Sequence, residues 1–444
     1  MINISYRAKT ALEILGDHGF EAFVVGGAVR DRLMGDIPGD YDITTNATPD
    51  KTVELFSRYK VIETGLRHGT VTVIIDGQPL EITTYRTESA YSDTRHPDSV
   101  QFTNSLQEDC ARRDFTINAI CYNPQLGIRD YYNGENDIKN KVIRCVGDPV
   151  QRFEEDALRI LRAVRFASVL GFEIEDKTKE AVFSCAHLLK NISAERIYTE
   201  LQKLLCGKNV KKVLLEYTQV LDVFMPQIMP AKGFDQKNYH HIYDVLEHTA
   251  VAVENIPPVP QLRMAALLHD FGKPATFTQD EKGVGHFYNH GEISWQMACD
   301  ILKKLKVSAE DYQLITTLVR YHDYPVLPNE KSVRRALNKF GEETLRMLLL
   351  LKRADNRGQN IADFDRKEEY DALEKVIDDV IRQRQCFSLK HLAVNGTDLI
   401  DMGVPPSPQT GYILNALLEM VINDDIPNHK EILLEKAGEI IKNI

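Results

Sequence analysis

The stretch AFVVGGAVRDRLMGDIPGDYDITT, residues 22–45, decides the fold of the N-terminal part of the chain. It opens with a short apolar run at 22–25 and turns at two consecutive glycines. A helix-like segment follows, and the stretch closes in the β-prone residues 43–45. This order of apolar run, glycine turn, helical pattern and second β-prone run predicts a strand, a helix and another strand.

A second pattern further along the chain predicts a β-hairpin. Residues 70–75 alternate between apolar and polar side chains, Asp76-Gly77 is a turn signal, and residues 80–85 run back. With the strand–helix–strand pattern before it, the hairpin predicts a mixed α and β region over the first ~145 residues. Strand signals are scarce after about residue 150, where helical patterns take over.

Three carboxylates fall on these predicted strands. Asp40 and Asp42 are two residues apart, so on a strand they point to one face. Such a pair repels unless a divalent cation lies between its members, and hard oxygen ligands suit magnesium. Glu81 on the hairpin would add a third carboxylate. We therefore expect Asp40, Asp42 and Glu81 to form a magnesium site for two-metal phosphoryl or nucleotidyl transfer.

Glycines and arginines near these carboxylates fit a triphosphate. The segment GGAVRD (26–31) matches neither the P-loop nor the GxGxxG pattern, but paired glycines let backbone amides approach phosphates, and Arg30 can bind them in bidentate fashion. The segment RRDFTINA (112–119) sets two adjacent arginines before a buried-type run. Those charges need partners, which the sequence leaves open between phosphates and an ion-paired turn.

A helix predicted from Phe153 onward repeats charged side chains every three residues, at Asp156, Arg159, Arg162 and Arg165. Asp156 could accept from the amino group of cytosine or adenine while Arg159 donates to the ring nitrogen, since uracil and guanine present the reverse pattern. The alternative is an i,i+3 salt bridge on a surface helix. Both interpretations stay open at this point.

Composition limits the class of protein. The chain has 444 residues, enough for about three domains, and a formal net charge of −11, which argues against a basic coat for non-specific nucleic-acid binding. Basic residues nevertheless gather between 139 and 212.

With no apolar run of 18 residues and no secretory signal, we expect a cytoplasmic protein without a membrane span. The seven cysteines have no metal-site spacing and are expected to be free thiols.

A set of imidazoles and carboxylates lies between residues 235 and 360. Mixtures of these groups bind divalent transition metals or magnesium. Its members, called here the histidine cluster, are His248, His269, Asp270, His290, His322 and Asp355.

The N-terminal motifs resemble class II CCA-adding enzymes, tRNA nucleotidyltransferases of the poly(A) polymerase head-domain family. The matching segments are GGAVRD, DYD, RRDFTINA, DYYNG (130–134), EDALR (155–159) and AERIYTEL (194–201), in the order of that family. The resemblance implies that CMP and AMP are added from CTP and ATP to the tRNA acceptor end without a nucleic-acid template, with release of pyrophosphate. It implies Mg²⁺ ligands at Asp40 and Asp42, and nucleotide-binding roles for Gly27, Arg30, Arg113, Asp156, Arg159, Arg162 and Arg165.

The segment RTESAYSDTRHP, residues 86–97, resembles the flexible loop with which this family switches from C to A addition. Enzymes that add only CC typically lack it, so CCA addition or A-only addition is expected here. A poly(A) polymerase, or an RNA-binding protein with an inactive head, are further alternatives. Intact Asp40, Asp42, Arg113, Asp156 and Arg159 argue against an inactive head.

The histidine cluster resembles the HD superfamily of metal-dependent phosphohydrolases, in its fuller two-metal form. That resemblance implies a second divalent metal, Mn, Ni, Co or Mg, with Lys273 near a phosphate. A hydrolase could then be the main activity, or a vestigial HD fold could only support tRNA binding. We read His240, His241 and His286 as outer or surface residues.

The expected fold class is α+β, with a mixed β-sheet in the N-terminal head and helices in the remainder. We expect a nucleotidyltransferase head at 1–145, a helical neck for RNA binding at 146–230, an HD domain at 231–370 and a helical tail at 371–444. The oligomeric state is left open.

Overall fold

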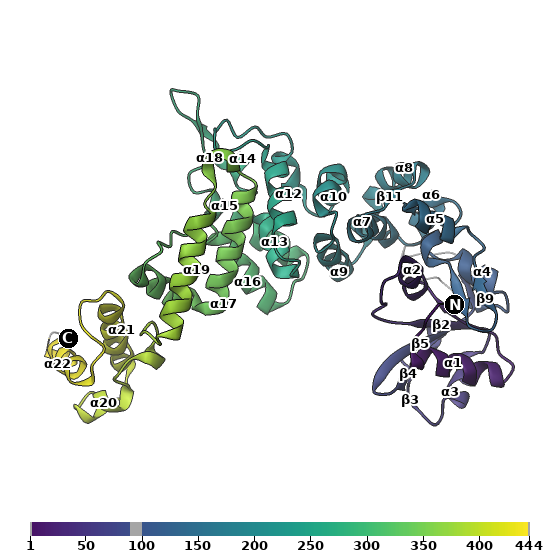
Figure 1. Ribbon diagram of the computed structural model, residues 1–444, viewed down its shortest axis with the longest axis horizontal. Coiled ribbons are helices and arrows are strands. Elements are labelled where there is room, and N and C mark those ends of the chain that lie inside the picture. The colour runs from purple at the N-terminus through teal and green to yellow at the C-terminus, as the bar shows by residue number, and fades with distance from the viewer. Residues whose placement is uncertain (1, 89–99, 443–444) are drawn as a thin grey trace. The chain divides into compact units, whose positions relative to one another are not determined.

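The computed structural model describes residues 2–88 and 100–442. The chain divides into two compact units, Met1–Met229 and Pro230–Ile444, which are described separately below (Figure 1). This division, between Met229 and Pro230, lies one residue before the boundary expected between the neck and the HD domain at 230/231. Most of the loop expected at residues 86–97 falls outside the described residues.

A mixed sheet of seven strands, counted within the described residues, forms the head, in the order β3-β4-β5-β2-β1-β8-β9. Strands β2 and β5 run parallel and their neighbours pair antiparallel, which confirms the mixed sheet. The strands are β1 (Ala22–Val25), β2 (Asp42–Thr45), β3 (Lys60–Ile62), β4 (Thr70–Ile75), β5 (Gln78–Thr84), β8 (Cys121–Asn123) and β9 (Gly127–Arg129). Outside this sheet, β6 (Arg86–Glu88) pairs with β7 (Val100–Phe102), and β10 (Val142–Ile143) with β11 (Glu173–Ile174).

The local patterns of the sequence explain these strands. The hairpin β4–β5 is confirmed, and Asp76 (φ 51°) and Gly77 (φ 73°) both take the left-handed conformation that a tight hairpin turn requires. On β2, Ile43 packs into the core shared with helix α1 (Tyr6–Asp17) and with the β4–β5 hairpin. Alternation along the strand then sends Asp42 to the opposite face of the sheet.

Helices form most of the rest of the N-terminal unit. They are α1, α2 (Gly27–Met34), α3 (Pro49–Leu55), α4 (Leu106–Ala111), α5 (Gly134–Asn140), α6 (Pro149–Glu155), α7 (Leu158–Leu170), α8 (Asp176–Ser184), α9 (Ala194–Leu205), α10 (Val210–Glu216) and α11 (Thr218–Asp222). The single helix predicted from Phe153 is wrong in one respect, because the chain leaves helical geometry at Asp156 (φ −138°, ψ 100°) and α7 begins two residues later. Asp156 therefore precedes α7, where its Oδ1 accepts from the backbone N–H of Leu158 (3.1 Å), instead of lying on the helix with the three arginines.

The second unit is almost entirely helical. Its elements are α12 (Val245–Asn255), α13 (Pro260–Leu268), α14 (Lys273–Thr276), β12 (Thr278–Gln279), β13 (Gly285–His286), α15 (His290–Lys304), α16 (Ala309–Arg320), α17 (Glu330–Arg357), α18 (Ile361–Phe364), α19 (Lys367–Arg382), α20 (Gly396–Asp401), α21 (Pro408–Ile422) and α22 (Lys430–Lys442). A separate apolar core unites residues 386–437, whereas the 370/371 boundary expected for the tail falls inside α19. Among the described residues, no helix is both long and apolar enough to span a membrane.

Candidate active sites

The three carboxylates expected in the head, called here the carboxylate edge, lie on two neighbouring interior strands of the sheet and in the loop just before one of them. Asp42 and Glu81 occupy paired positions on the parallel strands β2 and β5. Asp40 lies in the loop before β2, so the expectation that both aspartates lie on one strand is wrong. Desolvation, and then repulsion from Asp40 and Glu81, raise the pKa of Asp42 to about 6. A divalent cation would remove that repulsion, so the donor set fits one.

Two predicted phosphate-binding arginines flank the glycine turn that follows β1. A Cβ atom built on Gly26 would lie 3.7 Å from Nη1 of Arg113, and one built on Gly27 would lie 3.5 Å from Nη2 of Arg30. Gly26 itself has φ 75°, a conformation that favours glycine. Backbone amides at the start of α2 and two guanidinium groups therefore meet at one place, as a triphosphate requires.

The paired arginines of RRDFTINA have a protein partner, which resolves a question that the sequence leaves open. Asp109 of α4 is fully buried and forms ion pairs with Arg112 (2.7 Å) and Arg113 (3.2 Å). Burial alone would raise the pKa of Asp109, but the two guanidinium groups outweigh burial and lower it. Arg113 also reduces the pKa of Asp42, so it lies close enough to serve the carboxylate edge as well.

Asp114, which we did not expect as a functional residue, connects two of the predicted nucleotide-binding arginines. Its Oδ2 accepts from Nε (2.9 Å) and Nη2 (2.6 Å) of Arg162, and its Oδ1 accepts from Nδ2 of Asn118 (3.0 Å). Asn118 in turn accepts from Nη1 of Arg30 (2.7 Å). The buried ring of Phe166 adds a second link, since guanidinium carbons of Arg30 and Arg165 lie 5.1 and 3.9 Å from its centroid.

The base-reading pair proposed from the sequence is engaged with other groups. Oδ2 of Asp156 accepts from Nη2 of Arg196 on α9 (3.0 Å), while Arg159 donates to Glu155 (2.8 Å) and to the backbone oxygen of Arg112 (2.8 Å). Asp156 and Arg159 thus lie close to each other in the structure, but each is held by a different partner and they are not paired with one another. Arg165 forms a further ion pair with Glu200 of α9 (2.7 Å). The sequence pattern contained the charges, but the partners of Asp156 and Arg165 come from α9, which lies 35 to 40 residues further along the chain.

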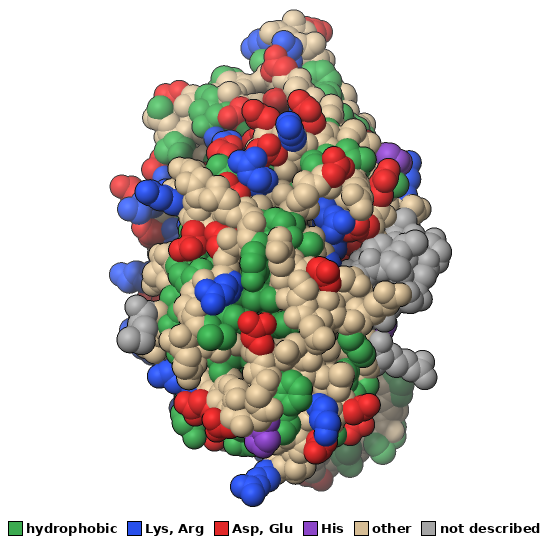
Figure 2. All heavy atoms as spheres, turned by 90° about the vertical axis from the view of Figure 1, so that its right-hand side faces the viewer, with side chains coloured by type: hydrophobic (Ala, Val, Ile, Leu, Met, Phe, Trp, Pro, Cys, Tyr) green, Lys and Arg blue, Asp and Glu red, His purple; other side chains and the backbone are tan. Residues whose placement is uncertain are grey.

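Charged side chains of both signs are interspersed over the face drawn in Figure 2. That face carries no continuous field of one sign, in keeping with the formal net charge of −11. Any RNA contact on it would use discrete basic side chains.

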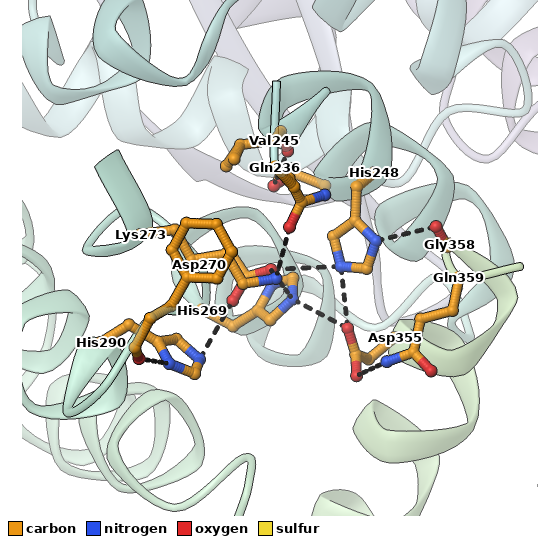
Figure 3. Close-up of polar contacts among 12 residues, drawn as sticks. Gln236, Val245, His248, His269, Asp270, Lys273, His290, Asp355, Gly358 and Gln359 are labelled. Carbon is orange, nitrogen blue, oxygen red and sulfur yellow. Dashed lines mark hydrogen bonds and ion pairs between the residues drawn. The ribbon is translucent and has the colours of Figure 1, made fainter. Parts of the chain in front are cut away.

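The histidine cluster is brought together in the second unit. His248, His290 and Asp355 lie on α12, α15 and α17, whereas His269, Asp270 and His322 lie in the turns after α13 and α16. Figure 3 labels every member except His322. Within the described residues, two groups have ligand atoms close enough to hold a metal ion: His248, His269, Asp270 and Asp355, and Asp270, His290 and His322. Asp270 belongs to both groups. Its Oδ2 lies 3.1 Å from Nε2 of His248, whereas its Oδ1 lies 3.4 Å from Nε2 of His290, so one carboxylate can bridge two cations.

The tautomers of the four imidazoles suit metal binding. In each, Nδ1 lies 2.7–2.9 Å from a backbone carbonyl oxygen. A carbonyl only accepts, so Nδ1 carries the proton and Nε2 faces the centre. Such support of the second ring nitrogen is typical of metal-ligating histidines.

Charge in this cluster is concentrated and buried. Burial alone would lower the pKa of His269, but Asp270 and Asp355 raise it to about 10. The pKa of His322, by contrast, is lowered by burial. Lys273 donates to Oδ2 of Asp270 (2.6 Å) and to Gln236 (3.0 Å), so it lies against the bridging carboxylate (Figure 3).

A cavity of about 270 Å³ opens beside both groups, lined in part by Asp270, Lys273, His290 and His322. Residues that the sequence analysis placed outside the site also line it. His241 and His286 do so, as does the exposed Tyr288, whose ring stacks on His286 at 5.5 Å between centroids and 14° between planes. Asp323 lines it too and was missed, although it directly follows His322 in the sequence.

Three family models match the chain. They describe the poly(A) polymerase head domain at residues 22–144, the RNA and SrmB-binding site of polymerase A at 171–232, and domain 2 of tRNA nucleotidyltransferases at 276–437. Together with the carboxylate edge and the flanking arginines, they define a nucleotidyltransferase of the poly(A) polymerase type.

Full-length relatives narrow that class. The CCA-adding enzyme of Ligilactobacillus salivarius is 35% identical over 98% of this chain and 96% of its own length. That of Bacillus cytotoxicus is 49% identical over 52% of this chain and 60% of its own length. The Bacillus stearothermophilus CCA-adding enzyme, solved in complex with CTP, superposes with a TM-score of 0.74 at 30% identity over 98% of both chains. The chain belongs to the family of CCA-adding enzymes, as its motifs predicted.

Proposed function

We propose that the head adds CMP, CMP and AMP, from CTP and ATP, to the 3′ end of tRNA without a nucleic-acid template and with release of pyrophosphate. The observation that carries this proposal is the carboxylate edge, Asp42 paired with Glu81 beside Asp40, facing arginines at a glycine turn. The relatives support the same substrates, since the Bacillus stearothermophilus enzyme was solved with CTP. A cytoplasmic location accords with tRNA as substrate.

In this proposal the residues divide into three roles. Asp40, Asp42 and Glu81 hold Mg²⁺, which stabilises charge on the α-phosphate and activates the 3′-hydroxyl when bound. Gly27, Arg30 and Arg113 receive the triphosphate. Base selection falls to Asp156 and Arg159, positioned by Arg196 and Glu155. Arg162 and Arg165 complete the nucleotide site beside Asp114 and Glu200.

The test is to sequence the 3′ ends formed on tRNA that ends before CCA, incubated with CTP alone, ATP alone or both. We expect CC with CTP alone, and CCA with both nucleotides. Products that carry A only on tRNA already ending in CC would identify an A-adding enzyme. Long A tails would identify a poly(A) polymerase.

We further propose that the histidine cluster is a two-metal phosphohydrolase site that acts on phosphate esters. The bridging Asp270 and the four Nε2 atoms directed at it support this, since a buried set of imidazoles and carboxylates fits Mn, Ni, Co or Mg. Bound there, such a cation supplies an activated water at neutral pH and neutralises phosphate charge. Lys273 would hold Asp270 in place and add positive charge at the cavity.

The aromatic wall of the cavity favours a substrate that carries a nucleobase. Tyr288 is 72% exposed and stacks on His286, and both line the cavity beside the cluster. Bases stack on such rings with about 1–3 kcal/mol each. A damaged tRNA end with a 3′-phosphate or 2′,3′-cyclic phosphate, which must be cleared before nucleotides are added, matches these features.

The assay for this second activity is hydrolysis of a 2′,3′-cyclic nucleotide and of p-nitrophenyl esters with manganese, nickel, cobalt or magnesium. His269→Ala should abolish hydrolysis and leave CCA addition intact, whereas the exposed His429→Ala should change neither. If the wild-type chain hydrolyses none of these esters with any metal and metal analysis finds none at the cluster, the second unit is a scaffold for tRNA.

A further inference from the structure

Asp323 lies within ligand distance of the second group of the histidine cluster. Its Oδ2 is 3.2 Å from Nε2 of His290 and 3.5 Å from Nε2 of His322. The two Nε2 atoms are themselves 3.1 Å apart, and Oδ1 of Asp270 lies 3.4 Å from the first and 3.9 Å from the second. Oδ2 of Asp323 therefore lies beside both Nε2 atoms of a group whose third ligand atom comes from Asp270.

These separations match the ligands of a small divalent cation. Nitrogen and oxygen atoms about 2.1 Å from a tetrahedral metal are about 3.4 Å from one another. The five distances above, from 3.1 to 3.9 Å, scatter around that value.

We propose that Asp323 is the fourth protein ligand of a divalent cation held by Asp270, His290 and His322. The inference rests on the proposed two-metal site. Each of the two cations then has two imidazole and two carboxylate ligands. Asp270 is shared by both groups, Asp355 is the second carboxylate of the first group, and Asp323 would be the second carboxylate of the other. Three carboxylates then face two divalent cations, which leaves net positive charge for a phosphate.

The position of Asp323 gives it a further role at the mouth of the site. Its side chain is 64% exposed, whereas Asp270 and His322 are almost fully buried. It lines the cavity described above and also a second cavity of about 420 Å³, formed with Arg320 and Tyr321. Asp323 is thus the solvent-facing ligand of the second cation.

The test measures metal binding rather than turnover. Full-length protein is stripped with a chelator and titrated with Co²⁺, whose visible spectrum reports imidazole ligation and is insensitive to the all-oxygen site of the head. Metal content is counted independently by mass spectrometry in an Asp42→Asn background. The variants are Asp323→Asn, Asp323→His, which keeps a ligand atom, and the control Asp300→Asn, an exposed carboxylate on α15.

We expect two equivalents in the parent and in Asp300→Asn, a second equivalent weakened at least tenfold in Asp323→Asn, and substantial recovery in Asp323→His. A purely structural role for Asp323 would not give that recovery. If the parent binds two equivalents and Asp323→Asn binds both unchanged, the ligand assignment is overturned while the two-metal site stands. If the parent binds fewer than two, the two-metal site itself fails and the assignment falls with it.

Discussion

Asp42 and Glu81 occupy paired positions on the parallel strands β2 and β5, so two carboxylates 39 residues apart in sequence point from one face of the sheet at neighbouring positions. Parallel pairing sets side chains of matched residues next to each other on one face. With Asp40 two residues before Asp42, the edge concentrates negative charge that a divalent cation would neutralise. The nucleotidyl transfer proposed for the head depends on this relationship.

Asp42→Asn should abolish nucleotide addition without unfolding the chain. The carboxylate lies among like charges that raise its pKa to about 6, so removing its charge relieves repulsion and should leave the thermal midpoint unchanged or higher in metal-free buffer. The measurements are CMP incorporation and thermal unfolding. Asp76→Asn at the hairpin turn is the matched control and should behave as wild type. Addition within tenfold of wild type would contradict the metal role.

Asp156→Ala and Arg159→Ala should relax base choice more than they weaken triphosphate binding, by about 1–3 kcal/mol of discrimination. Arg196→Ala should share this effect, because its guanidinium fixes Oδ2 of Asp156 at 3.0 Å. Incorporation of UTP and GTP relative to CTP and ATP measures the change. Unaltered selectivity in all three variants, with lower stability, would assign these residues a structural role only.

Asp114→Asn should destabilise the N-terminal unit and raise KM for both nucleotides. Burial alone would raise the pKa of Asp114, but Arg162 and Asn118 lower it to about 2, below the ~3.9 of an unfolded aspartate. The ionised form therefore stabilises the fold by about 2 kcal/mol above pH 5, and this stabilisation is lost as the pH falls from about 4 toward 2. Denaturant unfolding at pH 6 and pH 3.5 should show the difference between variant and wild type shrinking. An unchanged difference would exclude this linkage.

Removal of residues 89–97 should yield tRNAs that end in CC. This prediction rests on the resemblance of the segment to the loop with which the family switches from adding C to adding A. The cut leaves the β6–β7 pair in place. Sequencing of product 3′ ends is the measurement, and equal loss of C and A addition would mean that the segment supports the fold instead.

Tyr288→Ala should raise KM for a 2′,3′-cyclic nucleotide about tenfold and leave hydrolysis of p-nitrophenyl phosphate unchanged. Loss of one stacked base, worth about 1–3 kcal/mol, affects only substrates that carry a base. Tyr412→Ala, exposed on α21, is the control. An equal loss of hydrolysis with both substrates would mean that Tyr288 supports the structure of the histidine cluster and does not bind the base.

The sequence by itself determined the parts of this protein that depend on local order. Alternation predicted the β4–β5 hairpin, because side-chain direction repeats every two residues along a strand. The ordered histidines predicted a metal-type set, and the motifs predicted the family. The hairpin can be predicted because its pattern lies in neighbouring residues. The metal-type set can be predicted because clustered histidines and aspartates have few roles other than metal binding.

Only the tertiary structure decided which charges meet. Arg196 reaches Asp156 from another helix, and Asp114 links Arg162 to Arg30 through Asn118. The break at Asp156 was hidden because its neighbours are good helix formers, while the bond to Arg196 and the capping of Leu158 favour the extended conformation. Asp323 was missed because the sequence does not show that His290, 33 residues earlier in the chain, packs beside it. Pair energies depend on distance in space, which spacing along the chain does not specify.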